Sequence, residues 1–178
     1  MKRLFVLLAA LAAVSGVFAS GAFAGGGNTV ASCNASTGYF LNGSSVSGNL
    51  DVPAGTFCYL TGEFKGNVTV EGYAAPWGAT FDKNVIVNGG WLVALGPSSH
   101  FMSNLNISGS NYGVSGVNGL FASAGTPITI DGNLNYTGNS VPLQVTGPVT
   151  VKGTFNYSGN TVPWDASQAL VAGQSSIS

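Results

Sequence analysis

A seven-residue phrase recurs along this chain and limits the folds that the chain can adopt. Its frame is Φ-x-x-Asn-Φ-x-Φ, in which Φ is an apolar residue. The copies are VSGNLDV from Val46, FKGNVTV from Phe64, FDKNVIV from Phe81, FMSNLNI from Phe101, IDGNLNY from Ile130 and VKGTFNY from Val151. Successive copies start 18, 17, 20, 29 and 21 residues apart. A period of about 20 residues indicates a repeat architecture in which one copy is one structural unit.

The alternation inside each copy is that of a β-strand. In the copy from Ile130, the apolar Ile130, Leu134 and Tyr136 share one parity, whereas Asp131 and Asn133 have the other. Alternate side chains of a strand point to opposite faces, so each copy has one apolar and one polar face. The pattern predicts an all-β fold, a single parallel β-helix (solenoid) of about six coils. An antiparallel sandwich or barrel is the alternative, but its neighbouring strands need not repeat one phrase.

Stacked coils would place equivalent residues on top of one another. The inward apolar residues would then form columns, and the repeated asparagine would form a ladder in which each amide bonds the next coil. The residues of this predicted ladder are Asn49, Asn67, Asn84, Asn104 and Asn133. On the outer face, the same register predicts two favourable charge pairs, Lys65 with Asp82 and Asp131 with Lys152.

The first 24 residues have the pattern of a bacterial signal peptide. Lys2 and Arg3 precede an apolar run from Leu4 to Val17, and Ala22-Phe23-Ala24 fits the small-x-small cleavage pattern. Export is therefore expected, with the protein secreted or held at the cell surface. No later apolar run approaches the roughly 20 residues that a transmembrane helix needs.

The rest of the chain divides around the repeat. Residues 25–45 are the predicted N-terminal cap, 46–164 the parallel β-helix, and 165–178 a C-terminal cap and tail. In this tail, Asp165 is expected to cap a short helix that runs to about Ala172 and ends at Gly173. Residues 108–125 are expected to be either a protruding loop or an extra, poorly matching coil.

Cys33 and Cys58 are the two cysteines of the chain. In an exported protein they predict one disulfide, which would tie the N-terminal segment to the first coil. The alternative is a lipid anchor at Cys33, because Val30-Ala31-Ser32-Cys33 resembles a bacterial lipobox.

Charge excludes some classes of partner. Only 6% of the residues are charged, and the chain without its signal peptide has three lysines, six carboxylates and no arginine. Nucleic-acid binding depends on Lys and Arg at phosphates, so nucleic acid is not an expected partner. An anionic polysaccharide held by an arginine clamp is excluded on the same ground.

The sequence contains no recognisable catalytic or metal site. His100 is the single histidine, and the two cysteines lack metal-ligand spacing. Glu63 and Asp82 could be neighbours on adjacent coils, but Lys65 and Lys83 beside them favour a surface charge ladder over a glycosidase pair. We therefore expect a non-catalytic protein with no cofactor and no metal.

Aromatic residues are the remaining candidates for binding. Trp77, Trp91 and Tyr112, with Tyr59 and Tyr73, lie in or near expected turns and are a candidate platform for sugar rings.

The phrase G-N-V-x-V, once per coil, resembles the repeats of bactofilin-type polymers and of secreted bacterial right-handed β-helix proteins. VSGNLDV, FKGNVTV and IDGNLNY carry this likeness, which covers about residues 46–160. Bactofilins are cytoplasmic scaffolds that polymerise end to end, and the predicted signal peptide, disulfide and helical cap depart from that pattern.

The expected function is a secreted, non-catalytic β-solenoid that acts as a structural or adhesive module at the cell surface or in extracellular matrix. Its candidate partners are a cell-surface or extracellular polysaccharide, or a second copy of the chain. The alternatives are a carbohydrate-binding module and a polysaccharide-active enzyme on a β-helix scaffold.

Overall fold

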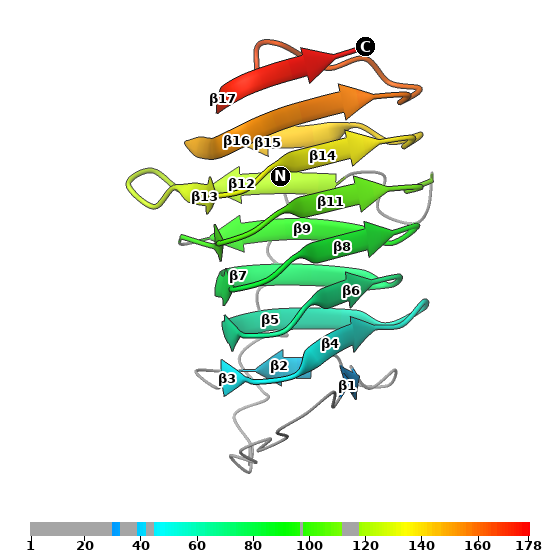
Figure 1. Ribbon diagram of the computed structural model, residues 1–178, viewed down its shortest axis with the longest axis vertical. Coiled ribbons are helices and arrows are strands. Elements are labelled where there is room, and N and C mark those ends of the chain that lie inside the picture. Colours follow the sequence, from blue (N-terminus) through cyan, green and yellow to red (C-terminus); the bar gives the residue numbers. More distant parts are fainter. Residues whose placement is uncertain (1–29, 33–38, 42–44, 97, 112–117) are drawn as a thin grey trace, which may run out of the picture.

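The chain winds into a parallel β-solenoid with three strands in most coils (Figure 1). This computed structural model describes residues 30–32, 39–41, 45–96, 98–111 and 118–178. All pairings between its named strands are parallel. The parallel solenoid of about six coils is confirmed, and the antiparallel alternative is wrong.

The strands stack in three columns, one for each side of the coil. The first column contains β1 (Val30–Ser32), β4 (Asn49–Val52), β6 (Val68–Val70), β8 (Val85–Asn88), β11 (Leu105–Ser108), β14 (Leu134–Thr137) and the second halves of β16 (Val149–Ser158) and β17 (Leu170–Ile177). The second column contains β2 (Tyr39–Leu41), the first halves of β5 (Phe57–Phe64) and β7 (Tyr73–Phe81), β9 (Trp91–Gly96), β12 (Asn118–Ala122) and β15 (Leu143–Thr146). The third column contains β3 (Ser45–Val46), the second halves of β5 and β7, β10 (His100–Phe101), β13 (Ile128–Ile130) and the first halves of β16 and β17.

The register between coils is the one that the phrase predicts. In the first column, Leu50 pairs with Val68, Val68 with Val85, and Val85 with Leu105. Leu105 then pairs with Leu134 across the longest gap of the repeat. Equivalent apolar residues of successive phrases therefore stack, and they line the inside of the coil.

The core is a set of such apolar rows. Phe64, Phe81 and Phe101 form a row from the third column, with ring centroids 5.1 and 4.9 Å apart and nearly parallel planes. All three are at most 1% exposed. Burying a side chain of this size contributes about 1.5–3 kcal/mol to stability.

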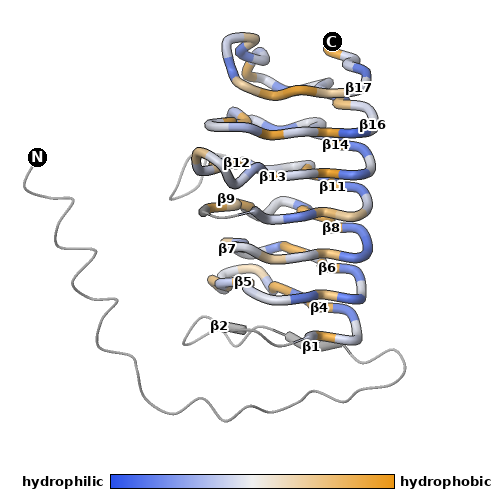
Figure 2. Tube along the Cα trace, turned by 90° about the vertical axis from the view of Figure 1, so that its left-hand side faces the viewer, coloured by the Kyte–Doolittle hydropathy of each residue, from blue (hydrophilic) through white to orange (hydrophobic). Residues whose placement is uncertain are grey.

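Glycine is required for steric reasons at the corner between the third and first columns. A Cβ atom on Gly66 would lie 2.3 Å from the carbonyl oxygen of Gly48 in the preceding coil. The stacked corners leave no space for a side chain at this position. Figure 2 shows the coils in side view, with hydrophilic residues following one another up the side that carries β4, β6, β8, β11 and β14.

The predicted C-terminal helix is wrong. Asp165 accepts hydrogen bonds from the Ser167 backbone N–H (2.9 Å) and hydroxyl (2.7 Å), but this closes only a single turn. The following residues form β17, which pairs in parallel with β16 and packs Leu170 and Ala172 against the core. A helix of two turns is marginal by itself, whereas an open strand edge offers a complete ladder of hydrogen bonds.

Two side chains close the C-terminal end in place of that helix. Trp164 packs on Phe155 and Tyr157, with ring centroids 4.8 and 5.6 Å away. Gln168 accepts a hydrogen bond from the Val145 N–H and donates one to the Leu143 carbonyl (3.2 Å). The amide of Gln168 thus pairs with the free edge of β15 as a neighbouring strand would.

Residues 108–125 are neither an extra coil nor wholly a loop, because they contain β12, the second-column strand of their coil. The predicted signal peptide and most of the predicted N-terminal cap lie outside the described residues. No helix in the described part of the chain is long and apolar enough to cross a membrane.

Candidate functional site

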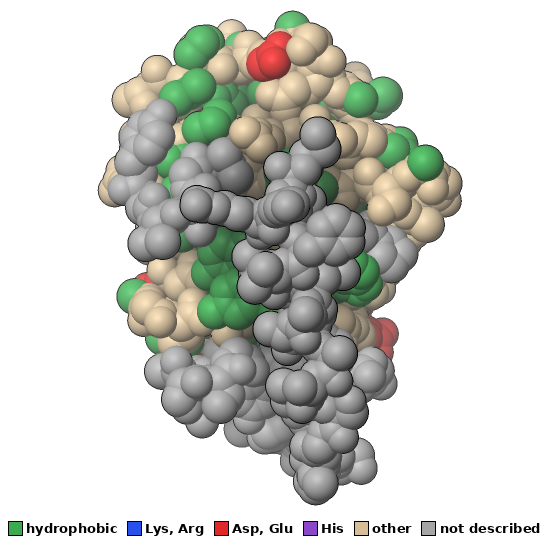
Figure 3. Space-filling model, turned by 180° about the vertical axis from the view of Figure 1, so that it is seen from behind, with side chains coloured by type: hydrophobic (Ala, Val, Ile, Leu, Met, Phe, Trp, Pro, Cys, Tyr) green, Lys and Arg blue, Asp and Glu red, His purple; other side chains and the backbone are tan. Residues whose placement is uncertain are grey.

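The outer side of the second column carries a cluster of aromatic and apolar side chains. We call it the aromatic face, and its members are Phe57, Tyr59, Tyr73, Trp77, Trp91, Leu95 and Phe121. They alternate along β5, β7, β9 and β12 with inward residues such as Cys58 and Ala74. Figure 3 views the molecule from this side, and hydrophobic side chains of the described residues are visible there in places.

The rings of this face pack on one another across coils. The ring of Phe57 stacks on Tyr73, with centroids 4.7 Å apart and planes 22° apart, and meets Tyr59 edge to face at 4.8 Å. Phe57 and Trp77 are nevertheless 38% and 49% exposed. These contacts hold Phe57, Tyr59 and Tyr73 in place, while part of the Phe57 ring stays open to solvent.

A glycine shapes the upper part of the aromatic face. A Cβ atom on Gly119 would lie 2.0 Å from the ring of Phe121, two residues further along β12. The ring of Phe121 therefore lies over the backbone of Gly119, which is possible only because position 119 has no side chain.

The two tryptophans of the predicted platform lie on this one face. Tyr73 is the register partner of Trp91, and Trp77 is the partner of Leu95. Tyr112, the third member of that platform, lies outside the described residues. Phe57 and Phe121 were not predicted as members; the strand parity of their segments would have identified them once the register was known.

The outer positions of the second column in β5, β7, β9, β12 and β15 carry no charged residue. Besides the aromatic face they are Ala75, Val93, Gly119, Gln144 and Thr146. Burial first, and the neighbouring Tyr59 second, raise the pKa of Tyr73. Its hydroxyl therefore remains a hydrogen-bond donor into alkaline solution.

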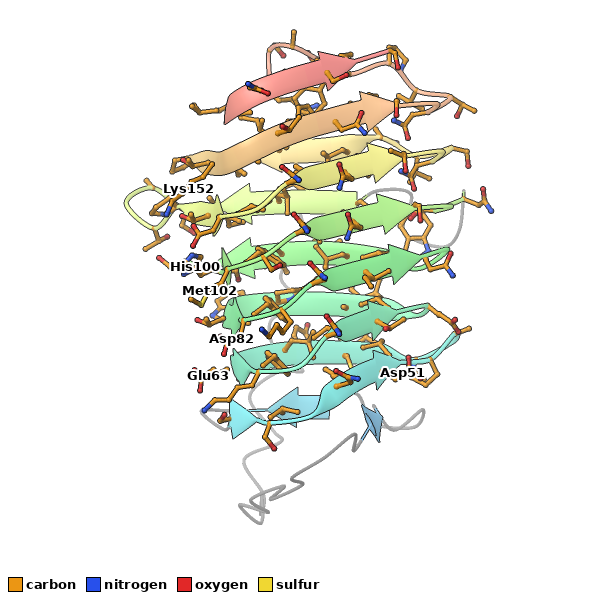
Figure 4. The ribbon with its side chains drawn as sticks, viewed as in Figure 1. Asp51, Glu63, Asp82, His100, Met102 and Lys152 are labelled. Carbon is orange, nitrogen blue, oxygen red and sulfur yellow. The ribbon has the colours of Figure 1, made fainter. Side chains whose placement is uncertain are left out.

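Charged residues gather on the third column instead. Figure 4 shows Glu63, Asp82, His100, Met102 and Lys152 one above another along that side. Lys152 Nζ lies 2.8 Å from Asp131 Oδ1, which is the predicted pair. The other predicted pair does not form. Lys65, directly after β5, binds Glu63 of that strand at 3.4 Å, and no contact with Asp82 is present among the described residues.

Asp131 also binds His100, whose Nε2 lies 3.0 Å from Asp131 Oδ2. The hydrogen bond from Lys152 is the largest cause of a lowered pKa at Asp131, and His100 adds to it. The group links three successive coils. The described residues contain no group of three or more His, Cys, Asp or Glu side chains that could hold a metal ion.

The asparagine positions of the phrase stack at the corner before the first column. Their side chains mostly bond the backbone of the next coil: Asn49 Oδ1 accepts from the Asn67 N–H, Asn84 from Asn104, Asn104 from Asn133, and Asn133 from the Thr154 N–H, at 2.8–3.3 Å.

A second polar ladder, at the corner after the first column, was not predicted. Asn139 Oδ1 accepts from the Ser110 N–H (2.9 Å), and Asn160 Oδ1 accepts from the Asn139 N–H (2.8 Å). The repeated segments TGNSVP and SGNTVP contain these asparagines and were the available signal. Both ladders satisfy backbone groups at corners, so their role is structural.

A groove of about 330 Å³ lies at the C-terminal end, between β15 and the segment that follows β16. Its lining includes Pro142, Gln144, Pro163 and Asp165. The carboxylate of Asp165 accepts two hydrogen bonds from Ser167, and Gln144, Thr146 and Gln168 add further polar groups to the lining.

Cys58 is fully buried and is not free. Cys33 lies outside the described residues, so the disulfide and the lipid anchor both stay predictions.

The comparisons with protein-family models, curated proteins and solved structures found no match. The likeness to β-helix proteins is therefore supported at the level of the solenoid architecture alone.

Proposed function

We propose that this chain is a secreted, non-catalytic β-solenoid that acts as an adhesive or structural module at the bacterial cell surface or in extracellular matrix. The observation that carries this proposal is the aromatic face. Phe57 and Trp77 leave 38% and 49% of their surface exposed on one strand face that also carries Trp91, and exposed apolar side chains gathered on one face mark interaction sites.

The fold suits such a role. Every coil contributes to one continuous core, so the solenoid holds its outer side chains on a rigid frame. A rigid frame lowers the entropy lost on binding, which favours adhesion through a small set of fixed rings.

The charged side of the molecule supports the non-catalytic part of the proposal. Glu63 and Asp82 occupy different outer rows, since Glu63 pairs with Thr80, and Glu63 is already bound to Lys65. A pair of carboxylates that shares a substrate would need to face a common space.

A carbohydrate-binding module is the second candidate, because tryptophan and tyrosine rings on one strand face are suited to stacking on sugars.

Adhesion is tested by adding the purified, fluorescently labelled chain to washed cells and extracellular matrix of the organism that makes it. We expect retention that falls in the double variant F57A/W77A and persists in Met102→Ala, which removes an equally exposed apolar side chain from the third column. No retention of the unchanged chain would refute the adhesive role. Release of new reducing ends from common polysaccharides at enzyme-like rates would refute the non-catalytic role.

A further inference from the structure

We propose that the aromatic face binds an uncharged polysaccharide, by stacking sugar rings on Phe57, Trp77 and Trp91. This inference rests on the proposed function and names the occupant of the adhesive surface. Three properties of the face favour this occupant over an anionic polymer, a lipid or a second protein.

The first property is the distribution of charge. The outer positions of the second column in β5, β7, β9, β12 and β15 carry no charged side chain, whereas Glu63, Asp82 and Lys152 lie along the side of the third column (Figure 4). An anionic polysaccharide or an anionic membrane would need lysine or arginine at the contact. An uncharged polymer needs neither.

The second property is the mixture of ring faces and polar edges. Tyr59 and Tyr73 carry hydroxyls, and Trp77 and Trp91 carry indole N–H donors. A sugar ring has an apolar C–H face and a rim of hydroxyls, so it can stack on a ring and bond these groups together. Acyl chains would bury the same donors without partners, at a cost of about 1–3 kcal/mol each.

The third property is the size of the face. Four strands at about 4.8 Å and about five residues at about 3.3 Å give a patch of about 300 Å². A stable protein–protein interface needs about 800 Å² from each partner. The face is therefore too small by itself to hold a second copy of the chain, but it is large enough for a few sugar rings.

Two rings of the face are already held before binding. Phe57 is fixed between Tyr59 and Tyr73, and Phe121 lies over Gly119. Little side-chain freedom is lost at these two positions when a ligand arrives, which favours binding.

The experiment is a binding isotherm of the purified full-length chain on microcrystalline cellulose and on chitin, both uncharged. Alginate gel (anionic) and phosphatidylcholine vesicles serve as the comparison surfaces. We expect retention on at least one of the uncharged polymers and none on alginate or vesicles. Trp77→Ala and Phe57→Ala should each weaken the retention about fivefold to tenfold, which is the scale of one aromatic contact.

The matched controls are Met102→Ala and Ile86→Ala, which remove exposed apolar side chains from the corner after β10 and from β8 of the first column. Both should bind like the unchanged chain, and circular dichroism of every variant checks that the solenoid is folded. Equal binding by Trp77→Ala, preferential binding to alginate or vesicles, or the absence of binding to both uncharged polymers would overturn the inference. A dimer in sedimentation that Trp77→Ala dissociates would overturn it as well.

These results separate the inference from the proposed function. Adhesion to cells that needs Trp77, without binding to either uncharged polymer, would refute the polysaccharide and leave the adhesive role intact. Binding to cellulose or chitin without any retention on cells or matrix would refute the adhesive role and leave the polysaccharide inference intact.

Discussion

Aromatic rings occur on both sides of this solenoid, and the two sets differ in how they are distributed. Inside, Phe64, Phe81 and Phe101 continue one row that every coil fills with an apolar residue. Outside, the described rings of the aromatic face come from β5, β7, β9 and β12, and the following strand of the column, β15, presents Gln144 and Thr146. The inner residues that every coil repeats stabilise the fold, whereas the outer rings that only some coils carry are available for binding.

The largest effect that this comparison predicts is the loss of an inner ring. Phe81→Ala should lower the free energy of unfolding by about 3–5 kcal/mol, because Phe81 is fully buried and stacks on a phenylalanine on either side. Trp77→Ala, on the outer face, should cost about 1 kcal/mol or less. Urea denaturation of the two variants measures the difference. Similar losses in both would abolish the distinction between inner and outer rings.

Substitution of two glycines, Gly66 at a corner and Gly119 on the aromatic face, tests the same difference in the backbone. Gly66→Ala would place a Cβ atom 2.3 Å from a backbone carbonyl of the preceding coil, which only a shift of the coil can relieve. We expect a loss of about 1–3 kcal/mol in urea denaturation.

Gly119→Ala is the matched substitution, since its Cβ atom would meet the side chain of Phe121 and that ring can rotate away. It should cost less than Gly66→Ala while changing the binding properties of the aromatic face. A larger loss for Gly119→Ala than for Gly66→Ala would contradict this assignment.

The next largest expected effect is the loss of one of the stacked asparagine side chains. Asn104 accepts the Asn133 N–H at 2.8 Å and donates to Asn84 Oδ1 at 3.2 Å. Asn104→Ala should lower the free energy of unfolding by about 1 kcal/mol, the usual net value of such a bond. An unchanged denaturation midpoint would show that water replaces the amide at this corner without cost.

The sequence predicted most of what the coils repeat. Register, inner rows and the Asp131–Lys152 pair follow from one phrase, because stacking forces equivalent residues together. The phrase covers only the third and first columns, so the second column, and with it Phe57 and Phe121 of the aromatic face, could not be placed. Local signals misled at the C-terminus: Asp165 does start a turn, but the open edge of β16 then directs residues 170–177 into a strand.

Lys65 shows the same limit for side chains. Its coil-to-coil neighbour was predictable, but the flexible ammonium group binds Glu63 in its own coil instead. Register fixes where a backbone position lies and does not fix which of several nearby carboxylates a long side chain contacts.

The smallest predicted effect concerns Asp131, where an outer group links three coils without belonging to the repeated phrase. Lys152, and then His100, lower the pKa of Asp131 in the folded chain below the ordinary value of about 3.9. The resulting stabilisation is fully present above about pH 4 and is lost as the pH falls through the lowered folded pKa. Because both partners are partly exposed, it should amount to less than about 1 kcal/mol. Asp131→Asn should remove this acid dependence from thermal unfolding curves, and Asp82→Asn, at the equivalent position two coils earlier, should retain it. If Asp131→Asn unfolds with the same pH dependence as the unchanged chain, the outer contacts contribute nothing, and only what the coils repeat determines stability.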